Sequence, residues 1–197
     1  GSTIPGTSVS CMDVSHAMAI YFAEHAQGAY ANKAILFSSR PQYIDFSTDD
    51  TLQKKLARIR RFTDCSNTDI EKTMMLILDT AVNGKLLQEE LPKSIVIISD
   101  MEFDEGTTRS GKTLFNTINK KFQDAGYTMP RIVFWNVCSR TGAIPMTQNE
   151  AGVALVSGFS INIINMVMSG KLDAYECLKE QLMKERYNPV AEAIAGV

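Results

Sequence analysis

The stretch "SIVIISD" at residues 94–100 decides the fold that this sequence predicts. Its apolar residues are consecutive and do not alternate with polar ones, which is typical of a strand covered by helices on both faces. Two similar runs follow, "RIVFWNV" at 131–137 and "GVALVSG" at 152–158, and a helical pattern at 111–126 separates the first two runs. Strands that alternate with helices predict an α/β fold with a doubly wound, mostly parallel sheet and helices on both faces.

Three acids follow the first run at intervals of two residues: Asp100, Glu102 and Asp104. Ligands of doubly wound folds bind at the carboxyl ends of the strands, so Asp100 lies where chemistry is expected. Carboxylates and hydroxyls are hard oxygen ligands that suit magnesium or calcium better than zinc. The alternative is that Asp100 caps the next turn and that the other two acids are solvated.

The segment before this stretch predicts a helix and then two strands. Residues 13–26 have helical spacing, and Asp13 or Ser15 would cap the start of this helix. Short apolar runs at 33–39 and 42–46 predict strands, and we expect the second at a sheet edge because a proline precedes it. The apolar face of the helix is expected to consist of Val14, Met18, Tyr21 and Phe22.

Two more helices are expected between residues 52 and 84. The first, "LQKKLARIRRF" at 52–62, is basic, and its charged face is either solvated or a contact for phosphate or an acidic partner. In the second, Thr68 and Glu71 have the spacing of a capping box, and Gly84 lies where the helix would end. The residues of the basic helix expected to face inward are Leu52, Leu56, Ile59 and Phe62.

The composition bounds the class of protein. The 197 residues are enough for one domain over 1–197, in which we expect 1–12 to form a loop and 172–187 a closing helix. A net charge of −2, from 20 basic and 22 acidic residues, gives no overall attraction to nucleic acid or to an anionic membrane. Four scattered cysteines without a zinc spacing suit a reducing cytoplasm. The most apolar late stretch, at 152–168, contains too many polar residues for a membrane span.

Four phrases, taken in order, carry a resemblance to a known family: "SDMEFD", "AGY", "IVFWN" and "GVALVSGFS". With the order of elements, they resemble the von Willebrand factor A-like (vWA) fold, a Rossmann-like architecture. The chain is most similar to an uncharacterised family that places a vWA-like domain after a helical region, which itself resembles the RNA-binding ring of the Ro autoantigen (the TROVE architecture). The resemblance runs from about residue 13 to residue 187.

The resemblance implies a protein-interaction module with a metal-ion-dependent adhesion site. Thr68 and Asp100 match the metal ligands of its second and third loops, and Mg²⁺, Mn²⁺ or Ca²⁺ would bind a partner's carboxylate there. The partner would be another protein or a neighbouring domain, whereas RNA would be bound by regions outside this chain. The residues expected to support the ligands are Asn67, Asp69, Glu102 and Asp104.

The sequence departs from the family pattern at its first motif, Asp-x-Ser-x-Ser. "CMDVSHAM" offers Asp13 and Ser15, but Ala17 stands where the second serine belongs, and no apolar strand precedes it. We therefore expect the first strand and its aspartate to lie upstream, with Ser2 as the last serine of the motif if Gly1-Ser2 is native rather than a cloning remnant. Metal binding by this chain would then be weak or absent, and two strand edges in the middle of the sheet would lack a partner.

Two other functions remain open on the sequence alone. The cluster of Asp100, Glu102 and Asp104 would also suit a magnesium-dependent phosphotransfer or nuclease domain. Against this, the later strand runs end near Asn136 and Ser157, which are not acidic. The third possibility is a metal-free structural domain, which the missing first motif favours.

Overall fold

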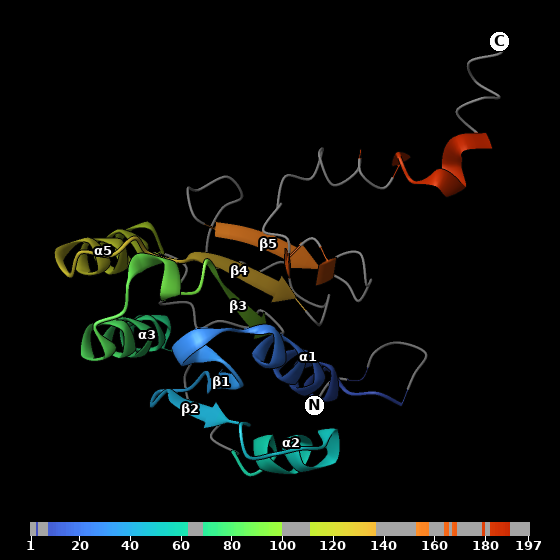
Figure 1. The fold of residues 1–197 in the computed structure, drawn as a ribbon, viewed down its shortest axis with the longest axis horizontal. Helices are drawn as coiled ribbons and strands as arrows, with labels where there is room; N and C mark the ends of the chain where they lie inside the picture. The colour runs from blue at the N-terminus through green and yellow to red at the C-terminus, as the bar shows by residue number, and fades with distance from the viewer. Residues whose placement is uncertain are drawn as a thin grey trace. The chain divides into compact units, whose positions relative to one another are not determined.

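The computed structural model describes residues 3, 8–62, 69–99, 111–136, 153–157, 164–165, 167–168, 179 and 182–189. The chain divides into two compact units, 1–157 and 158–197, each of which is described by itself. The elements of the first unit (Figure 1) are, in order, α1 (Cys11–His25), η1 (Gly28–Tyr30), β1 (Lys33–Leu36), β2 (Gln42–Asp45), α2 (Leu52–Ile59), α3 (Ile70–Gly84), η2 (Gln88–Glu90), β3 (Ser94–Ser99), α5 (Gly111–Asp124), β4 (Arg131–Asn136) and β5 (Val153–Ser157).

The strands form two sheets. β3, β4 and β5 pair in parallel, with Ser94 opposite Arg131 and Ile132 opposite Val153. β1 and β2 form a separate antiparallel pair. The α/β class and the three parallel strands are therefore confirmed. Among the residues that the structure describes, no ladder joins β1 to β3, so the β1–β2 pair and the three parallel strands are two separate sheets. The doubly wound, vWA-like arrangement of the whole sheet stays a prediction.

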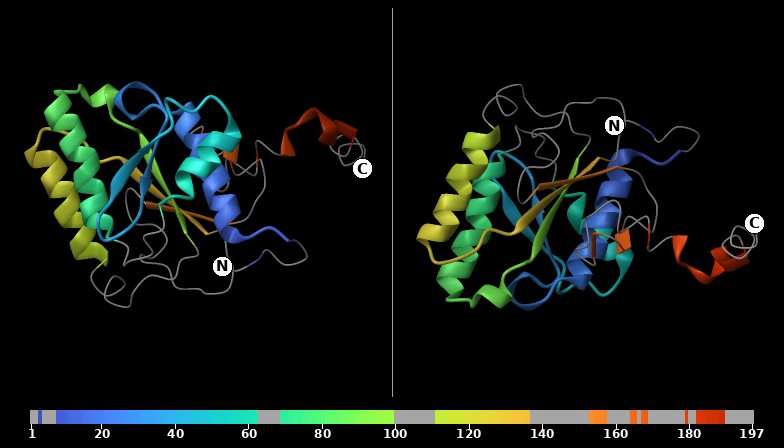
Figure 2. Two further views of the ribbon diagram at one scale, coloured as in Figure 1. Left: turned by 90° about the horizontal axis from the view of Figure 1, so that it is seen from below. Right: turned by 90° about the horizontal axis from the view of Figure 1, so that it is seen from above.

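Helices cover both faces of the parallel strands. On one face, Phe134 of β4 meets Phe115 of α5 with 6.4 Å between the ring centroids. On the other face, the neighbouring Trp135 meets Phe22 of α1 at 6.1 Å. Because successive side chains of a strand point to opposite faces, these two contacts place α5 and α1 on opposite sides. Figure 2 shows α3 and α5 on one side of the strands and α1 and α2 on the other.

The β1–β2 hairpin lies between the same two helix layers. Ile35 and Tyr43 pack against the buried cluster that α3 and α5 share with β3 and β4. On the opposite face of the hairpin, Ile44 and Phe46 join a second cluster with α1 and α2. The two sheets therefore occupy one layer of the fold, although they are not hydrogen-bonded to each other.

Three tyrosine hydroxyls form hydrogen bonds with the second half of α3. The Tyr30 hydroxyl donates to the Ile77 carbonyl at 3.0 Å. The Tyr127 hydroxyl lies 3.3 Å from the Ala81 carbonyl of the helix and 2.8 Å from the Leu86 carbonyl, just beyond the end of the helix. The Tyr43 and Thr80 hydroxyls share a hydrogen bond of 2.8 Å. Burial raises the pKa of Tyr30 far above its usual range, so its hydroxyl stays protonated as a donor.

The start and the buried face of α1 differ from expectation. The helix begins at Cys11, and its N-cap is Ser10, whose hydroxyl accepts a hydrogen bond from the Asp13 amide at 3.0 Å. Ile20 and Ala23 are buried, whereas Tyr21, which we expected on the apolar face, is 36% exposed. α1 packs against the layer of β1 and β3 and also contacts α2, and Tyr21 lies largely outside this covered surface.

The basic side chains of α2 and the residues that follow it are largely paired with acids of the chain itself. Lys54 pairs with Asp50 at 2.6 Å. Three further pairs join Lys55 to Glu24, Arg58 to Asp49 and Arg60 to Asp13. This pairing favours the reading of a structural, solvated face over that of a phosphate contact. The expectation for Leu52 was wrong, because this residue starts the helix and is 59% exposed.

In the second unit, the helix expected over 172–187 is not continuous. Lys184 has an extended backbone conformation and precedes the 3₁₀ helix η3 (Glu185–Tyr187). A helical hydrogen bond from the Met183 amide to the Lys179 carbonyl precedes this break. Within the described part of the chain, no helix has the length and apolar character that crossing a membrane requires.

The hydroxyl bond of Tyr30 can be tested by substitution. Tyr30→Phe removes the donor to Ile77 and keeps the ring, so we expect the free energy of unfolding to fall by about 0.5–1.5 kcal/mol. Urea denaturation measures the change. Tyr21→Phe is the matched control because its side chain is partly exposed, and its effect should stay within about 0.5 kcal/mol. Equal effects of the two substitutions would contradict a role for the Tyr30 hydroxyl.

Candidate functional site at the carboxyl ends of the strands

The candidate site begins with the parallel strands, which all end at one edge. β3 ends at Ser99, β4 at Asn136 and β5 at Ser157, and Ser99 is in register with Asn136, which is in register with Ser157. A serine, an asparagine and a second serine therefore occupy neighbouring positions, in register, at this edge. The carboxyl edge of a parallel sheet is where ligands of α/β proteins bind.

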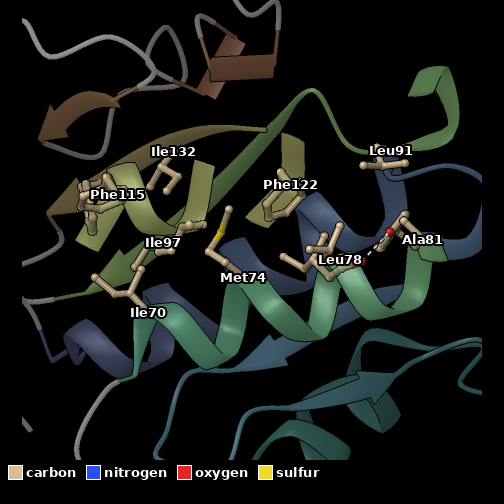
Figure 3. Packing of buried hydrophobic residues seen from close by; sticks show 13 residues of the cluster. Ile70, Met74, Leu78, Ala81, Leu91, Ile97, Phe115, Phe122 and Ile132 are labelled. Atoms are coloured by element: carbon tan, nitrogen blue, oxygen red, sulfur yellow. Dashed lines mark hydrogen bonds between the residues drawn. The ribbon is translucent and has the colours of Figure 1, made fainter. Parts of the chain in front are cut away.

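Two helices begin near the same edge. In Figure 3, Ile70, Ile97 and Phe115 lie at one end of the buried cluster, and Ala81 and Leu91 lie at the other. Ile70 is the first residue of α3, Phe115 belongs to the first turns of α5, and Ile97 lies in the carboxyl half of β3. The amino ends of both helices, which carry partial positive charge, therefore lie near the carboxyl end of β3.

The turn after β1 reaches the start of α3. The Lys72 ammonium donates to the Ser39 carbonyl at 3.3 Å across this turn. Ser38 is completely buried, and its hydroxyl accepts a hydrogen bond from the Arg40 amide at 3.2 Å. This contact brings the carboxyl end of β1 to the same part of the molecule as the first turn of α3.

Asp69 is the described residue from the predicted site. It is the N-cap of α3, and its carboxylate accepts a hydrogen bond from the Lys72 amide at 2.9 Å and pairs with the Lys72 ammonium at 3.0 Å. Burial opposes the ionisation of Asp69, but the hydrogen bonds from Lys72 outweigh it and keep the pKa of Asp69 below its usual value. Asp69 thus has a structural role, and its expected role in supporting a metal ligand stays a prediction.

The capping box expected from Thr68 and Glu71 is not the one that forms. The cap is Asp69, one residue later, and Glu71 instead pairs with Lys121 of α5 at 2.6 Å. The physical reason is that a one-residue shift of the helix start moves Glu71 to the second helical position, from which its side chain reaches a neighbouring helix rather than the cap.

The other predicted site residues lie outside the residues that the structure describes. They are Asn67, Thr68, Asp100, Glu102 and Asp104. Two of them adjoin described residues of this edge, because Thr68 directly precedes Asp69 and Asp100 directly follows Ser99. The structure thus brings the chain positions next to the two predicted metal ligands to the same end of the fold.

The described residues do not by themselves form a metal site. No group of three histidine, cysteine, aspartate or glutamate side chains gathers in the part of the chain that the structure describes. Polar side chains of described residues near this edge include those of Ser38, Asp69, Ser99 and Asn136. The assignment of Thr68 and Asp100 as metal ligands stays a prediction.

Sequence reasoning did not include the turn after β1 in the site. The stretch "FSSR" at 37–40 could have indicated this turn, because two serines and an arginine directly follow an apolar strand. The contact between Ser39 and Lys72 spans 33 residues of sequence, and no local pattern predicts it.

These observations define an α/β domain with polar residues gathered at the carboxyl ends of its parallel strands. The chain belongs to the family described as "Domain of unknown function (DUF7788)", whose model matches residues 2–193. It is similar to "Uncharacterized protein L728" of Acanthamoeba polyphaga mimivirus, with 29% identity over 161 residues. That match covers 81% of this chain, which spans only 28% of the viral protein. No solved structure matches the chain.

The charge of Asp69 can be tested by its pH dependence. Asp69→Asn keeps an oxygen that accepts the Lys72 amide and removes the charge. Because folding lowers the pKa of Asp69 below its ordinary value of 3.8, the charge stabilises the fold above that pH, and its contribution is lost as the pH falls through the folded pKa. We expect the variant to be less stable than the parent at pH 7 and the difference to shrink in acid.

Urea denaturation over a series of pH values measures this difference. Asp69→Ala is the comparison, because it removes the cap as well as the charge and should cost about 0.5–2 kcal/mol at pH 7. A stability difference between the parent and Asp69→Asn that grows as the pH falls would contradict the assignment.

Proposed function

We propose that this domain is a protein-interaction module of vWA type, which binds a partner's carboxylate through a divalent cation held at the carboxyl ends of its strands. The observation that supports the proposal most directly is the placement of Asp69 and Ser99. These residues adjoin Thr68 and Asp100 in sequence, and the structure brings the start of α3 to the carboxyl half of β3. The two predicted ligands lie 32 positions apart in sequence, and each directly adjoins a described residue at this end of the fold.

The chemistry of the edge suits a binding role. Thr68 would contribute a hydroxyl and Asp100 one carboxylate, and the described strand ends Ser99, Asn136 and Ser157 are uncharged. With few anionic ligands, a bound Mg²⁺ or Mn²⁺ would keep affinity for a carboxylate supplied from outside. Asn67, Glu102 and Asp104 would orient the ligands or their water.

The finer architecture is part of the same proposal. Three parallel strands, an antiparallel hairpin in the same layer and helices on both faces are the parts expected of a vWA-like domain. The partner in this proposal is a protein or a neighbouring domain. In the longer proteins of this family, RNA would be bound by regions outside residues 1–197, because this chain carries a net charge of only −2.

Calorimetric titration with magnesium and with manganese tests the metal site. We expect binding that Asp100→Ala weakens by at least about 100-fold, because the substitution removes a direct ligand. Asp104→Ala is the matched control, since an acid that only supports the ligands should cost about 10–100-fold at most. The titration is performed on residues 1–197 and on the complete natural protein.

Three outcomes would overturn the proposal. Binding in neither protein would favour a metal-free structural domain. Binding that Asp100→Ala leaves unchanged would place the ion elsewhere. Magnesium-dependent hydrolysis of a phosphodiester, lost in Asp100→Ala, would favour a nuclease or phosphotransfer domain instead.

A further inference from the structure

One surface of the first unit lies where α1 starts and α2 ends. This α1–α2 corner consists of Val9, Met12, Arg60 and Arg61. Lys55, in the first half of α2, pairs with Glu24 near the end of α1. Arg60, which follows α2, pairs with Asp13 in the first turn of α1 at 3.2 Å. The two helices therefore run in opposite directions, and Figure 2 shows the start of α1 on the side to which the arrowheads of β3 and β4 point.

The corner exposes two apolar side chains. Met12, the second residue of α1, is 53% exposed, and Val9, which directly precedes the cap Ser10, is 41% exposed. Ser10 also forms an antiparallel bridge with Thr3, so the backbone between the two side chains is held in place. Exposed apolar side chains with charged neighbours are typical of interaction surfaces, in which methionine is enriched.

The charge of the corner comes from two arginines and one aspartate. Arg60 pairs with Asp13, but its side chain stays 60% exposed. Arg61 is exposed, and it has no acidic partner in the part of the chain that the structure describes. It thus differs from the three basic residues of α2, which are paired within the chain. A guanidinium is planar and offers parallel N–H donors, which suits it to bind a carboxylate.

His16 connects the apolar and the charged parts of the corner. It follows Met12 by one helical turn, so both residues lie on the same side of α1. Burial and then the positive charge of Arg60 lower the pKa of His16, which requires Arg60 to lie near this side of the helix. The imidazole is therefore neutral near pH 7, and the positive charge here belongs to the arginines.

From this arrangement we infer that the α1–α2 corner docks an acidic segment of a partner protein that also carries apolar side chains. Carboxylates of the segment pair with Arg60 and Arg61. Its apolar side chains pack against Val9 and Met12. A protein fits this surface better than a nucleic acid does, because half of the corner is apolar and the chain carries a net charge of −2.

The corner goes beyond the proposed metal site and needs no cation. The test is therefore performed in EDTA, so that its failure and the failure of the proposed function are distinguishable. The probe is a short fluorescein-labelled peptide that repeats Glu-Glu-Leu-Gly, and fluorescence anisotropy measures its binding to the full chain. We expect it to bind more tightly than a peptide with glutamine in place of glutamate and than one with serine in place of leucine.

Substitutions locate the binding. Arg61→Glu reverses a charge that has no acidic partner in the described chain, so we expect it to weaken peptide binding by at least about 5-fold. Lys120→Glu makes the same charge change on the exposed side of α5 and should alter binding by less than about 2-fold.

The apolar contact has its own matched pair of variants. Met12→Ser should weaken binding by at least about 5-fold, because it removes the side chain on which the leucine packs. Leu52→Ser is the control, because Leu52 is 59% exposed at the opposite end of α2, and its effect should stay below about 2-fold.

Four results would overturn the inference. Absence of peptide binding in EDTA, including binding that appears only with magnesium, would remove the corner as a docking surface. Equal effects of Arg61→Glu and Lys120→Glu would show that the peptide responds only to overall charge. Tighter binding of a single-stranded oligonucleotide that Arg61→Glu abolishes would make the corner a nucleic-acid contact. Self-association in analytical ultracentrifugation that Met12→Ser abolishes would mean that a second copy covers the corner.

Discussion

The burial of one face of α3 is the constraint on which the rest of the first unit depends. This face packs against the parallel strands and against the hairpin, so both sheets must lie in one layer although they are not paired. Tyr30 and Tyr127 hold the second half of the helix by hydrogen bonds to its carbonyl groups and to that of Leu86. With α3 held in this way, its first turn and the cap Asp69 lie near the carboxyl half of β3.

The strands and the layers were predictable because strands that are buried on both faces are recognisable in the sequence. β3 and β4 need consecutive apolar residues, and the expected runs match them to within one residue at their ends. Which strands pair with each other was harder to predict from the sequence. An apolar run shows that a strand is covered, but it does not show which strand lies beside it, and the break between β1 and β3 depends on that choice.

The sequence did not predict the residues that cap two of the helices, nor the contacts between residues far apart in the chain. Ser10 caps its helix three or five residues before the positions that we expected, and Asp69 caps its helix one residue after, because several hydroxyl or acidic residues compete there and packing selects one. The contact between Ser39 and Lys72 depends on the hairpin lying against α3, which no local pattern encodes. The order of strand, acid and helix after β3 indicated the site edge, and the described ends of β3, β4 and β5 agree with it.

The capped starts of α1 and α3 show how carboxylates bind at helix starts in this fold. The start of α1 is already occupied by Asp13, which accepts hydrogen bonds from the Ser10 amide and hydroxyl. The start of α3 is occupied by Asp69, whose charge is also balanced by Lys72. The positions that favour an anion at these two helices are thus filled by the chain's own acids. In the function proposed above, a partner's carboxylate would approach Asp100 as a like charge, and a divalent cation between the two carboxylates would make that approach favourable.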